Sequence, residues 1–565
     1  MLELDKKTLL RNTLFTLIVF VGAVIRFYHL GNYPLGDSES RLALSALHIF
    51  NSTGQSIASL YSVLTGLVFW LFNTSDFTAR VIPAITGVLI IVLPIVWREK
   101  FGTLTAFFLA LFLAVDPSMV HLSRNANSMV LAIAAFGYLL WALSNKKIGS
   151  AGLFFGLVVF SGKEGWLLII SCLFAILIMH FVIKANWLKT VKNAVTDQFP
   201  KFATGFFAPF AILLLMAVFF KGSAGLAVVY GGLFNFFGDL LTVNSVQWSI
   251  PILALVLYEG LAIFLGLLGG NELISSFEDV GFLFLVSVFA LVISLVVPSR
   301  DVSDIAWIIP VLLLLGALFA SRFVSEISEF NKETWAMFVF SSVLIIFMVL
   351  NYMAIAMVTM DASSAQMRWT VLIGSFTMLA ASLVLVTYGW SFEIAWKGIA
   401  LAILSFFFVT NLGNTWATAH LRPLATQELW DAPTFQVFGH PVSDQVKEIS
   451  TLSGHDVTLD TITLAGISSP SVNWSLKDKK IIELPAMANY DQMTMIVLAQ
   501  PGSQDPNLVD HFRGKDITFS YTVPFESITL ADWMRWTVTH NFPLVENKVS
   551  FWLRAEKFLD SQNSQ

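Results

Sequence analysis

Charged side chains recur in three short segments of an otherwise apolar chain. They are Asp37, Glu39 and Arg41 in the first segment, Asp116, His121 and Arg124 in the second, and Lys163 and Glu164 in the third. A carboxylate can accept the proton of an attacking hydroxyl group. Arginine and lysine can stabilise a phosphate that leaves with the bonding electrons. If the three segments meet, their side chains could transfer a sugar from a lipid phosphate to a hydroxyl group.

The composition indicates which solvent surrounds these segments. The chain has 565 residues, of which 56% are apolar and 13% are charged, and its mean hydropathy is +0.74. An ordinary soluble chain has about 25% charged residues. Because so few charges cannot cover a water-facing surface, most of the chain must contact lipid. A single cysteine, Cys172, excludes a disulfide framework.

The charges divide the chain into two parts. Residues 1–412 contain 22 basic and 21 acidic residues, whereas residues 413–565 contain 11 basic and 17 acidic residues. We therefore expect a membrane domain over 1–412 and an acidic soluble domain over 413–565, called the C-terminal domain below. Neither part is basic enough to indicate nucleic-acid binding.

Hydropathy predicts thirteen membrane-spanning helices, since each needs about 20 mostly apolar residues. They lie near residues 12–30, 81–97, 103–121, 128–144, 149–162, 165–183, 203–220, 249–269, 279–298, 304–321, 335–358, 369–389 and 394–412. A further run, 56–72, could either span the membrane or lie at its surface.

The positive charges of the loops decide between these two alternatives. With 56–72 at the interface, the early loops on the side of the N-terminus carry eight basic residues and the opposite loops carry three. A spanning 56–72 would reverse that bias. We therefore predict outer loop and interfacial helices at 31–80, a cytoplasmic N-terminus and an extracytoplasmic C-terminal domain, in a multi-pass protein of the cell membrane. The three charged segments then share the extracytoplasmic side.

The C-terminal domain alternates strand-like and helical segments. Runs rich in β-forming residues lie at 457–464, 493–499, 517–523 and 549–555, and helical stretches lie at 443–452, 507–513 and 532–540. This alternation predicts a small α/β domain. Its sequence contains no glycine-rich nucleotide-binding motif and no Cys/His spacing typical of a metal site.

Several motifs resemble those of the multi-span glycosyltransferases of the GT-C fold, in the branch of protein O-mannosyltransferases and aminoarabinose transferases. The motifs are the acidic segment and following helix at 37–43, the Asp-Phe-Thr-Ala-Arg-Val-Ile-Pro-Ala stretch at 76–84, Asp116-Pro117, Ser123-Arg124 and Ser161-Gly162-Lys163-Glu164. Segments 471–478 and 549–554 are similar to those of a prokaryotic subgroup associated with flippase activity. The resemblance implies a GT-C bundle and an inverting transfer from a polyprenyl-phosphate-linked sugar at the extracytoplasmic face. The acceptor would be a protein, glycan or lipid.

The chemistry of the reaction assigns roles to the candidate residues. Glu39 or Asp37 would be the catalytic base, and the spacing of the family motif favours Glu39. Arg41, Arg124 and Lys163 would bind the donor phosphate. The further site candidates are Asp116, Glu164 and His121.

Two departures from the family pattern keep an alternative function open. Ser38 separates the two acids that are adjacent in the family, and Asn125, Asn127 and Ser128 follow Arg124 where relatives often carry an acid. The participation of a divalent metal ion is therefore open. The alternative function is that of a non-catalytic GT-C-like protein that binds a lipid-linked sugar and assists its flipping or hand-over. A transporter is disfavoured because the ionisable residues gather at one face rather than at the midplane.

Structural roles compete with these functional ones. Asp37 could cap a helix, and Arg124 could anchor the chain at the lipid headgroups. Lys163 and Glu164 could pair with each other. The sequence leaves these alternatives open.

Overall fold

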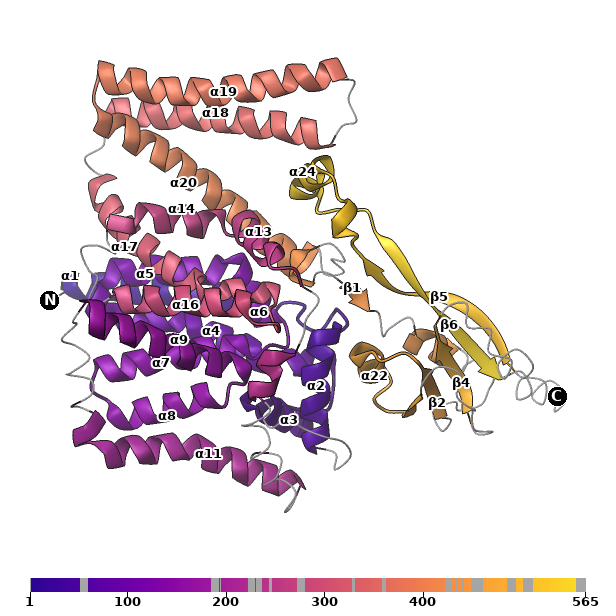
Figure 1. The fold of residues 1–565 in the computed structure, drawn as a ribbon. Coiled ribbons are helices and arrows are strands. Elements are labelled where there is room, and N and C mark those ends of the chain that lie inside the picture. Colours follow the sequence, from indigo (N-terminus) through magenta and orange to yellow (C-terminus); the bar gives the residue numbers. More distant parts are fainter. Residues whose placement is uncertain are drawn as a thin grey trace.

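The computed structural model describes most of the chain as one helical bundle followed by a sheet (Figure 1). It describes residues 2–50, 59–183, 193, 195–221, 229, 236–242, 246–271, 280–327, 331–357, 362–421, 428–431, 434–437, 442–448, 461–484, 494–500 and 512–554.

The membrane domain consists of helices. They are α1 (Leu2–Phe27), α2 (Asp37–Phe50), α3 (Leu60–Phe72), α4 (Asp76–Phe101), α5 (Thr103–Val115), α6 (Pro117–Arg124), α7 (Met129–Ser144), α8 (Ile148–Val159), α9 (Lys163–Ile178), η1 (Met179–Ile183), α11 (Phe199–Lys221), α13 (Ser249–Tyr258), α14 (Gly260–Leu268), α16 (Phe282–Val296), η3 (Val302–Trp307), α17 (Ile309–Ile327), α18 (Lys332–Met357), α19 (Ala362–Gly389), α20 (Phe392–Trp416) and η4 (Ala417–Leu421).

Each of the thirteen predicted spans coincides with a helix or with a bent pair of helices. Within the described residues, eight helices are long and apolar enough to cross a membrane, or ten if each bent pair is one span. The bent pairs are α5–α6, with an angle of 57°, and α13–α14, with an angle of 78°. The other three predicted spans are the shorter apolar helices α7, α8 and α16.

The outermost helices show what surrounds the bundle. Large apolar side chains of α18 and α19 are exposed, among them Phe340, Phe376 and Leu385. A continuous apolar surface of this kind is stable only against another apolar phase. The protein is therefore a multi-pass membrane protein.

Helices α2 and α3 lie at the end of the bundle next to the C-terminal domain, and the N-terminus lies at the opposite end (Figure 1). Helix α3 has 13 residues. At about 1.5 Å per residue it covers roughly 20 Å, less than the roughly 30 Å hydrocarbon core of a bilayer. Its length and position fit the interfacial helix expected within 56–72, of which 56–58 lie outside the described residues.

Serine caps set where α3 and α4 begin. The Ser59 hydroxyl accepts a hydrogen bond from the Ser62 amide (3.1 Å), and the Ser75 hydroxyl accepts one from the Thr78 amide (3.1 Å). Both serines belong to reciprocal capping boxes, which satisfy two amides that a helix start would otherwise leave unpaired. The cap at Ser75 places Arg80 on the first turns of α4.

The C-terminal domain is built on a six-stranded mixed sheet. Its elements are η5 (Leu429–Asp431), β1 (Thr434–Val437), β2 (Thr461–Ala465), α22 (Pro470–Ser475), β3 (Lys480–Leu484), β4 (Thr494–Ala499), β5 (Phe512–Thr522), η7 (Phe525–Ser527), α24 (Leu530–Thr539) and β6 (Val545–Arg554). The strand order is β1-β5-β6-β4-β2-β3. Strand β2 pairs in parallel with β3 and β4, and the other pairs are antiparallel.

The predicted strands of this domain are confirmed in the described residues, because the four runs coincide with β2, β4, β5 and β6. The described parts of 443–452 and 532–540 are helical except His540, the C-cap of α24. The helix predicted at 507–513 is wrong at Phe512 and Arg513, which begin β5, while 507–511 lie outside the described residues. Phe512 and Arg513 pair with Arg554 and Leu553 of β6, so the ladder overrides the local helical pattern.

Among the contacts that join the domains, two are between α-helices. Helix α22 packs against α2, and α24 packs against α18 (Figure 1). At the second contact, the hydroxyl groups of Tyr352 and Thr537 are 2.6 Å apart. Helix α20 itself continues past residue 412 to Trp416, so the chain enters the C-terminal domain as a helix.

Candidate functional site

A buried ion pair ties the first loop to α4. The Arg80 guanidinium donates from Nε to Glu39 Oε1 (2.8 Å) and from Nη2 to Glu39 Oε2 (2.6 Å). Glu39 also accepts from the amides of Ala126 (2.7 Å) and Gly36 (3.3 Å). Both oxygens of Glu39 are thus occupied, and the side chains of the pair are at most 10% exposed. Such an arrangement satisfies a buried charge and holds the loop in one conformation.

The same arginine arranges the loop that precedes α2. Arg80 donates to the carbonyl oxygens of Leu30 (3.3 Å), Tyr33 (2.8 Å) and Pro34 (3.2 Å). The planar guanidinium group of arginine has five N–H donors and can therefore donate to several acceptors at once. The chain between α1 and α2 is therefore folded around Arg80.

Arg124 caps the end of α1. Its Nη1 donates to the carbonyl oxygens of Ile25 (2.8 Å), Arg26 (3.1 Å) and Tyr28 (2.9 Å). A cation placed at the last carbonyls of a helix stabilises that end. Among the described residues, Nη2 of Arg124 has no hydrogen bond, which leaves it able to bind an anion.

Asp37 contacts the C-terminal domain rather than the bundle. Its Oδ1 accepts hydrogen bonds from the Ser469 hydroxyl (3.0 Å) and the Ser471 amide (2.9 Å). No other hydrogen bond to this carboxylate occurs within the described residues. Asp37 is half-buried, as its place at the first turn of α2 requires.

Lys163 and Arg41 both lie near enough to Asp239 to act on its charge. Partial burial raises the pKa of the Asp239 carboxyl, and the nearby charges of Lys163 and Arg41 oppose that rise. Lys163 Nζ donates to the Ser299 carbonyl (3.1 Å), and Glu164 accepts from the Ser128 hydroxyl (2.9 Å). Arg41 is exposed.

The two bent pairs of helices meet at their breaks, where each pair carries a carboxyl group. Asp116 lies at the break between α5 and α6, where it caps α6 through the Met119 amide (2.9 Å). Glu259 lies at the break between α13 and α14 and accepts hydrogen bonds from the hydroxyl and amide of Ser118. Asp116 Oδ2 and Glu259 Oε2 are both buried and have no hydrogen-bond partner among the described residues. Glu259 therefore joins the two breaks through the hydrogen bonds that it accepts from Ser118.

The hydrogen bonds of Glu259 predict how this residue tolerates substitution. Glu259→Gln should leave the thermal unfolding temperature of the purified protein within a few degrees of the wild type, because the amide oxygen can still accept from Ser118. Glu259→Ala should lower the free energy of unfolding by about 1–3 kcal/mol, since it leaves the buried amide and hydroxyl of Ser118 without their acceptor. The exposed acid Glu393, changed to alanine, is the matched control. Equal losses in the two Glu259 variants would contradict this role of Glu259 as an acceptor.

His121 belongs to an aromatic stack that reaches the C-terminal domain. Its ring stacks on Trp430 with centroids 4.8 Å apart, and Trp430 stacks on Tyr258 at 4.7 Å. The Tyr258 hydroxyl donates to Glu428, which also pairs with His540 at 3.1 Å. The five side chains come from α6, from α13, from the segment 428–431 and from the end of α24, so this stack joins the membrane domain to the C-terminal domain.

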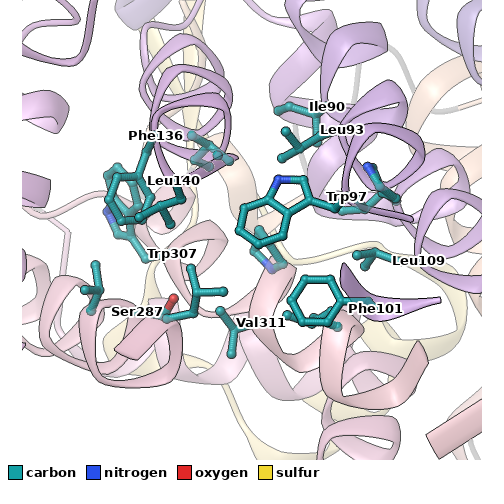
Figure 2. Close-up of a pocket in the computed structure, with 18 of the residues that line it drawn as sticks. Ile90, Leu93, Trp97, Phe101, Leu109, Phe136, Leu140, Ser287, Trp307 and Val311 are labelled. Carbon is teal, nitrogen blue, oxygen red and sulfur yellow. The ribbon is translucent and has the colours of Figure 1, made fainter. Parts of the chain in front are cut away.

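An apolar cavity lies within the bundle. Figure 2 shows Trp97, Phe101, Trp307 and Val311 around it. It lies between α4, α5, α7, α9, α16 and α17. Leu113, which lines it, lies one helical turn before Asp116. The cavity has the mainly apolar lining of a site for an apolar chain.

Comparisons with known proteins found similar solved structures. No protein-family model matches the sequence, and no curated protein matches it. The chain is similar to ArnT from Cupriavidus metallidurans bound to undecaprenyl phosphate, with 13% identity and a TM-score of 0.49 over 96% of this chain and 98% of that one. It is similar to the archaeal oligosaccharyltransferase AglB from Archaeoglobus fulgidus in complex with an inhibitory peptide and a dolichol-phosphate, with 12% identity and a TM-score of 0.45 over 94% of this chain and 77% of that one.

The structure brings most of the sequence-predicted residues to one end of the bundle. Glu39 pairs with Arg80 and accepts from the amide of Ala126, two residues after Arg124. The charge of Arg80 is near enough to Arg124 to lower its pKa, and Lys163 and Arg41 both lie near Asp239. Asp116 is turned into the bundle, toward Glu259, and His121 toward Trp430. Lys163 and Glu164 do not form an ion pair within the described residues; each has another partner.

Sequence reasoning missed the partner of Glu39, whereas it marked Glu259 as a mid-span charge explained by a hydrogen bond to a neighbouring helix, which the structure shows. Arg80 belongs to a family-like motif, but its pairing with Glu39, 41 residues away, carries no local signal. Glu259 is the sole charge in the apolar run 249–269, and a charge at membrane depth is a signal for a buried polar contact. As for metal sites, the described residues contain no group of three or more His, Cys, Asp or Glu side chains that could hold an ion.

Proposed function

We propose that the protein is a membrane glycosyltransferase that moves a sugar from a polyprenyl-phosphate donor to a hydroxyl acceptor at the extracytoplasmic face. The supporting observation is that an accessible carboxylate, Asp37, and the cations Arg41, Arg124 and Lys163 lie at one end of the bundle. The bundle also contains an apolar cavity. These are the groups that a donor with a charged phosphate and a long apolar tail requires.

Asp37 is the better of the two candidate bases on geometric grounds. Glu39 accepts four hydrogen bonds, two of them from Arg80, so protonating it would break a buried ion pair. Asp37 uses one oxygen for the C-terminal domain and keeps Oδ2 for an acceptor hydroxyl. Glu39 then acts as a positioning residue that holds the loop carrying Asp37.

Three cations serve the donor phosphate in this proposal. Arg41 is exposed, both Arg41 and Lys163 lie near Asp239, and Arg124 keeps Nη2 for an anion. Positive charge around the bridging oxygen stabilises the phosphate as it leaves. The isoprenoid tail would occupy the apolar cavity.

The orientation follows from loop charge. The bias of basic residues toward the loops on the side of the N-terminus supports a cytoplasmic N-terminus. The C-terminal domain lies at the other end of the bundle, and thus on the extracytoplasmic side (Figure 1). An acceptor protein, glycan or lipid would approach from the side of the C-terminal domain.

One observation favours the second candidate, a non-catalytic protein that binds a lipid-linked sugar. Both carboxylates of the first loop already have protein partners, since Glu39 pairs with Arg80 and Asp37 with the C-terminal domain. A site of this kind would bind the donor without reacting.

Turnover separates the two functions. The full chain in nanodiscs is incubated with a panel of polyprenyl-phosphate-linked hexoses and aminopentose, with and without a membrane extract as acceptor, and released polyprenyl phosphate is measured. Release that depends on the acceptor supports the transferase. Donor binding without release supports the second function, and neither binding nor release with any donor would refute both.

A further inference from the structure

Three hydrogen bonds connect one short segment of the C-terminal domain to the starts of α2 and α4. Two of them, from the Ser469 hydroxyl and the Ser471 amide, go to Asp37 Oδ1. The third runs from Trp474 Nε1 to Asp76 Oδ1, at 2.7 Å. The residues joined by these three hydrogen bonds are 432, 434 and 398 positions apart in the sequence.

Trp474 makes this contact a packed one. Its side chain is 3% exposed and belongs to the same apolar cluster as Leu35, Ala43, Phe69 and Ala79 from the first loop, α2, α3 and α4. The Trp474 and Phe69 rings have centroids 5.7 Å apart. A buried aromatic anchor fixes the position of neighbouring polar groups, because its rotamer is held by packing. Ser469 is therefore held firmly against Asp37, and it is itself 2% exposed.

We propose that the C-terminal domain completes the active site by positioning the catalytic carboxylate, with Ser469 as the positioning residue. This inference rests on the proposed transferase function. Both donors bind the same oxygen, Oδ1, which fixes the rotation of the carboxylate and directs Oδ2 away from the domain contact. A catalytic group held in one orientation reacts faster than a freely rotating one.

The step that this orientation serves is the transfer itself. The acceptor oxygen forms a bond to the anomeric carbon while the bond from that carbon to the phosphate oxygen breaks. The electron pair leaves with the phosphate, and the acceptor proton moves to Asp37 Oδ2. The products are the glycosylated acceptor and polyprenyl phosphate.

The test compares single substitutions at neighbouring serines in the full chain. Ser469→Ala removes the hydroxyl donor and should lower kcat about tenfold, the rate equivalent of one hydrogen bond to a charged group, while KM for the polyprenyl-phosphate donor changes less than twofold. Ser475→Ala is the matched control, since the Ser475 hydroxyl donates to the Val472 carbonyl within α22 and not to Asp37, and this variant should retain the wild-type kcat. Ser469→Thr keeps a hydroxyl group and should restore most of the activity.

Two further measurements separate positioning from loss of structure. Trp474→Phe removes the hydrogen bond to Asp76 but none to Asp37. It should therefore lower the unfolding temperature, while kcat should fall less than in Ser469→Ala. In an Asp37→Asn background, Ser469→Ala should lower the residual rate no further, because the group that it positions no longer acts as a base.

The outcomes identify which claim fails. Full activity in Asp37→Asn would overturn the proposed catalytic role itself. Inactive Asp37→Asn together with a wild-type kcat in Ser469→Ala would overturn only the positioning role. A higher kcat in Ser469→Ala would also overturn it, because the domain would then restrain the carboxylate instead of preparing it.

Discussion

Asp37→Asn should lower kcat for sugar transfer by two to four orders of magnitude, the usual contribution of a general base. The amide cannot accept the acceptor proton, but its oxygen can still accept the hydrogen bonds from Ser469 and the Ser471 amide. The contact between the domains should therefore persist. Release of polyprenyl phosphate measures kcat, and the thermal unfolding temperature in detergent reports on the fold.

Glu39→Gln is the control for this prediction, because it neutralises the neighbouring acid of the same loop. It removes the charge opposite Arg80 and should reduce stability together with activity. Asp37→Asn should therefore lower kcat alone, whereas Glu39→Gln should lower both kcat and the unfolding temperature. An Asp37→Asn protein with more than half of the wild-type kcat would refute the assignment of Asp37 as the base.

Arg80→Met should produce the largest loss of stability of any single substitution considered. It leaves Glu39 as a buried carboxylate without its counterion, and removing one partner of a buried ion pair costs about 3–5 kcal/mol. The loop carbonyls of Leu30, Tyr33 and Pro34 lose their donors in addition. Unfolding of the purified variant, followed by heat or denaturant, measures the loss.

A double substitution shows how much of that loss arises from the ion pair. Arg80→Met combined with Glu39→Gln removes both charges, so it should be more stable than Arg80→Met alone. The surface pair Glu393–Lys397 provides the comparison, since breaking an exposed pair should cost about 0–1 kcal/mol. Losses that simply add in the double variant would show that Glu39 and Arg80 do not act as a pair.

The membrane domain was predictable because hydropathy is a local property. A helix in lipid must satisfy its own backbone hydrogen bonds, so an apolar run of sufficient length has few alternatives. The breaks within 103–121 and 249–269 were harder to predict. Asp116-Pro117 favours a helix start, but only contact with Ser118 and Glu259 shows that the two breaks face each other.

The candidate site was predictable in its location and less so in its roles. The three charged segments fall at loops on the same side, because alternate loops of a membrane bundle share a face. The proposal of Asp37 rather than Glu39 as the base depends on Arg80. Its guanidinium pairs with Glu39, 41 positions away in the sequence, and leaves Asp37 without a counterion of this kind. No pattern around either acid encodes that choice.

The amino-acid sequence by itself determined that the chain is embedded in a membrane, where its spans lie, and which loops carry charge. It did so because a bilayer imposes a one-dimensional rule on length and polarity. Tertiary structure alone decided which charges are neutralised in pairs and which carboxylate remains accessible. It also decided that the Ser469 hydroxyl donates a hydrogen bond to Asp37. Those outcomes depend on distances between segments that are remote in the chain, and distances arise only when the helices and the C-terminal domain pack together.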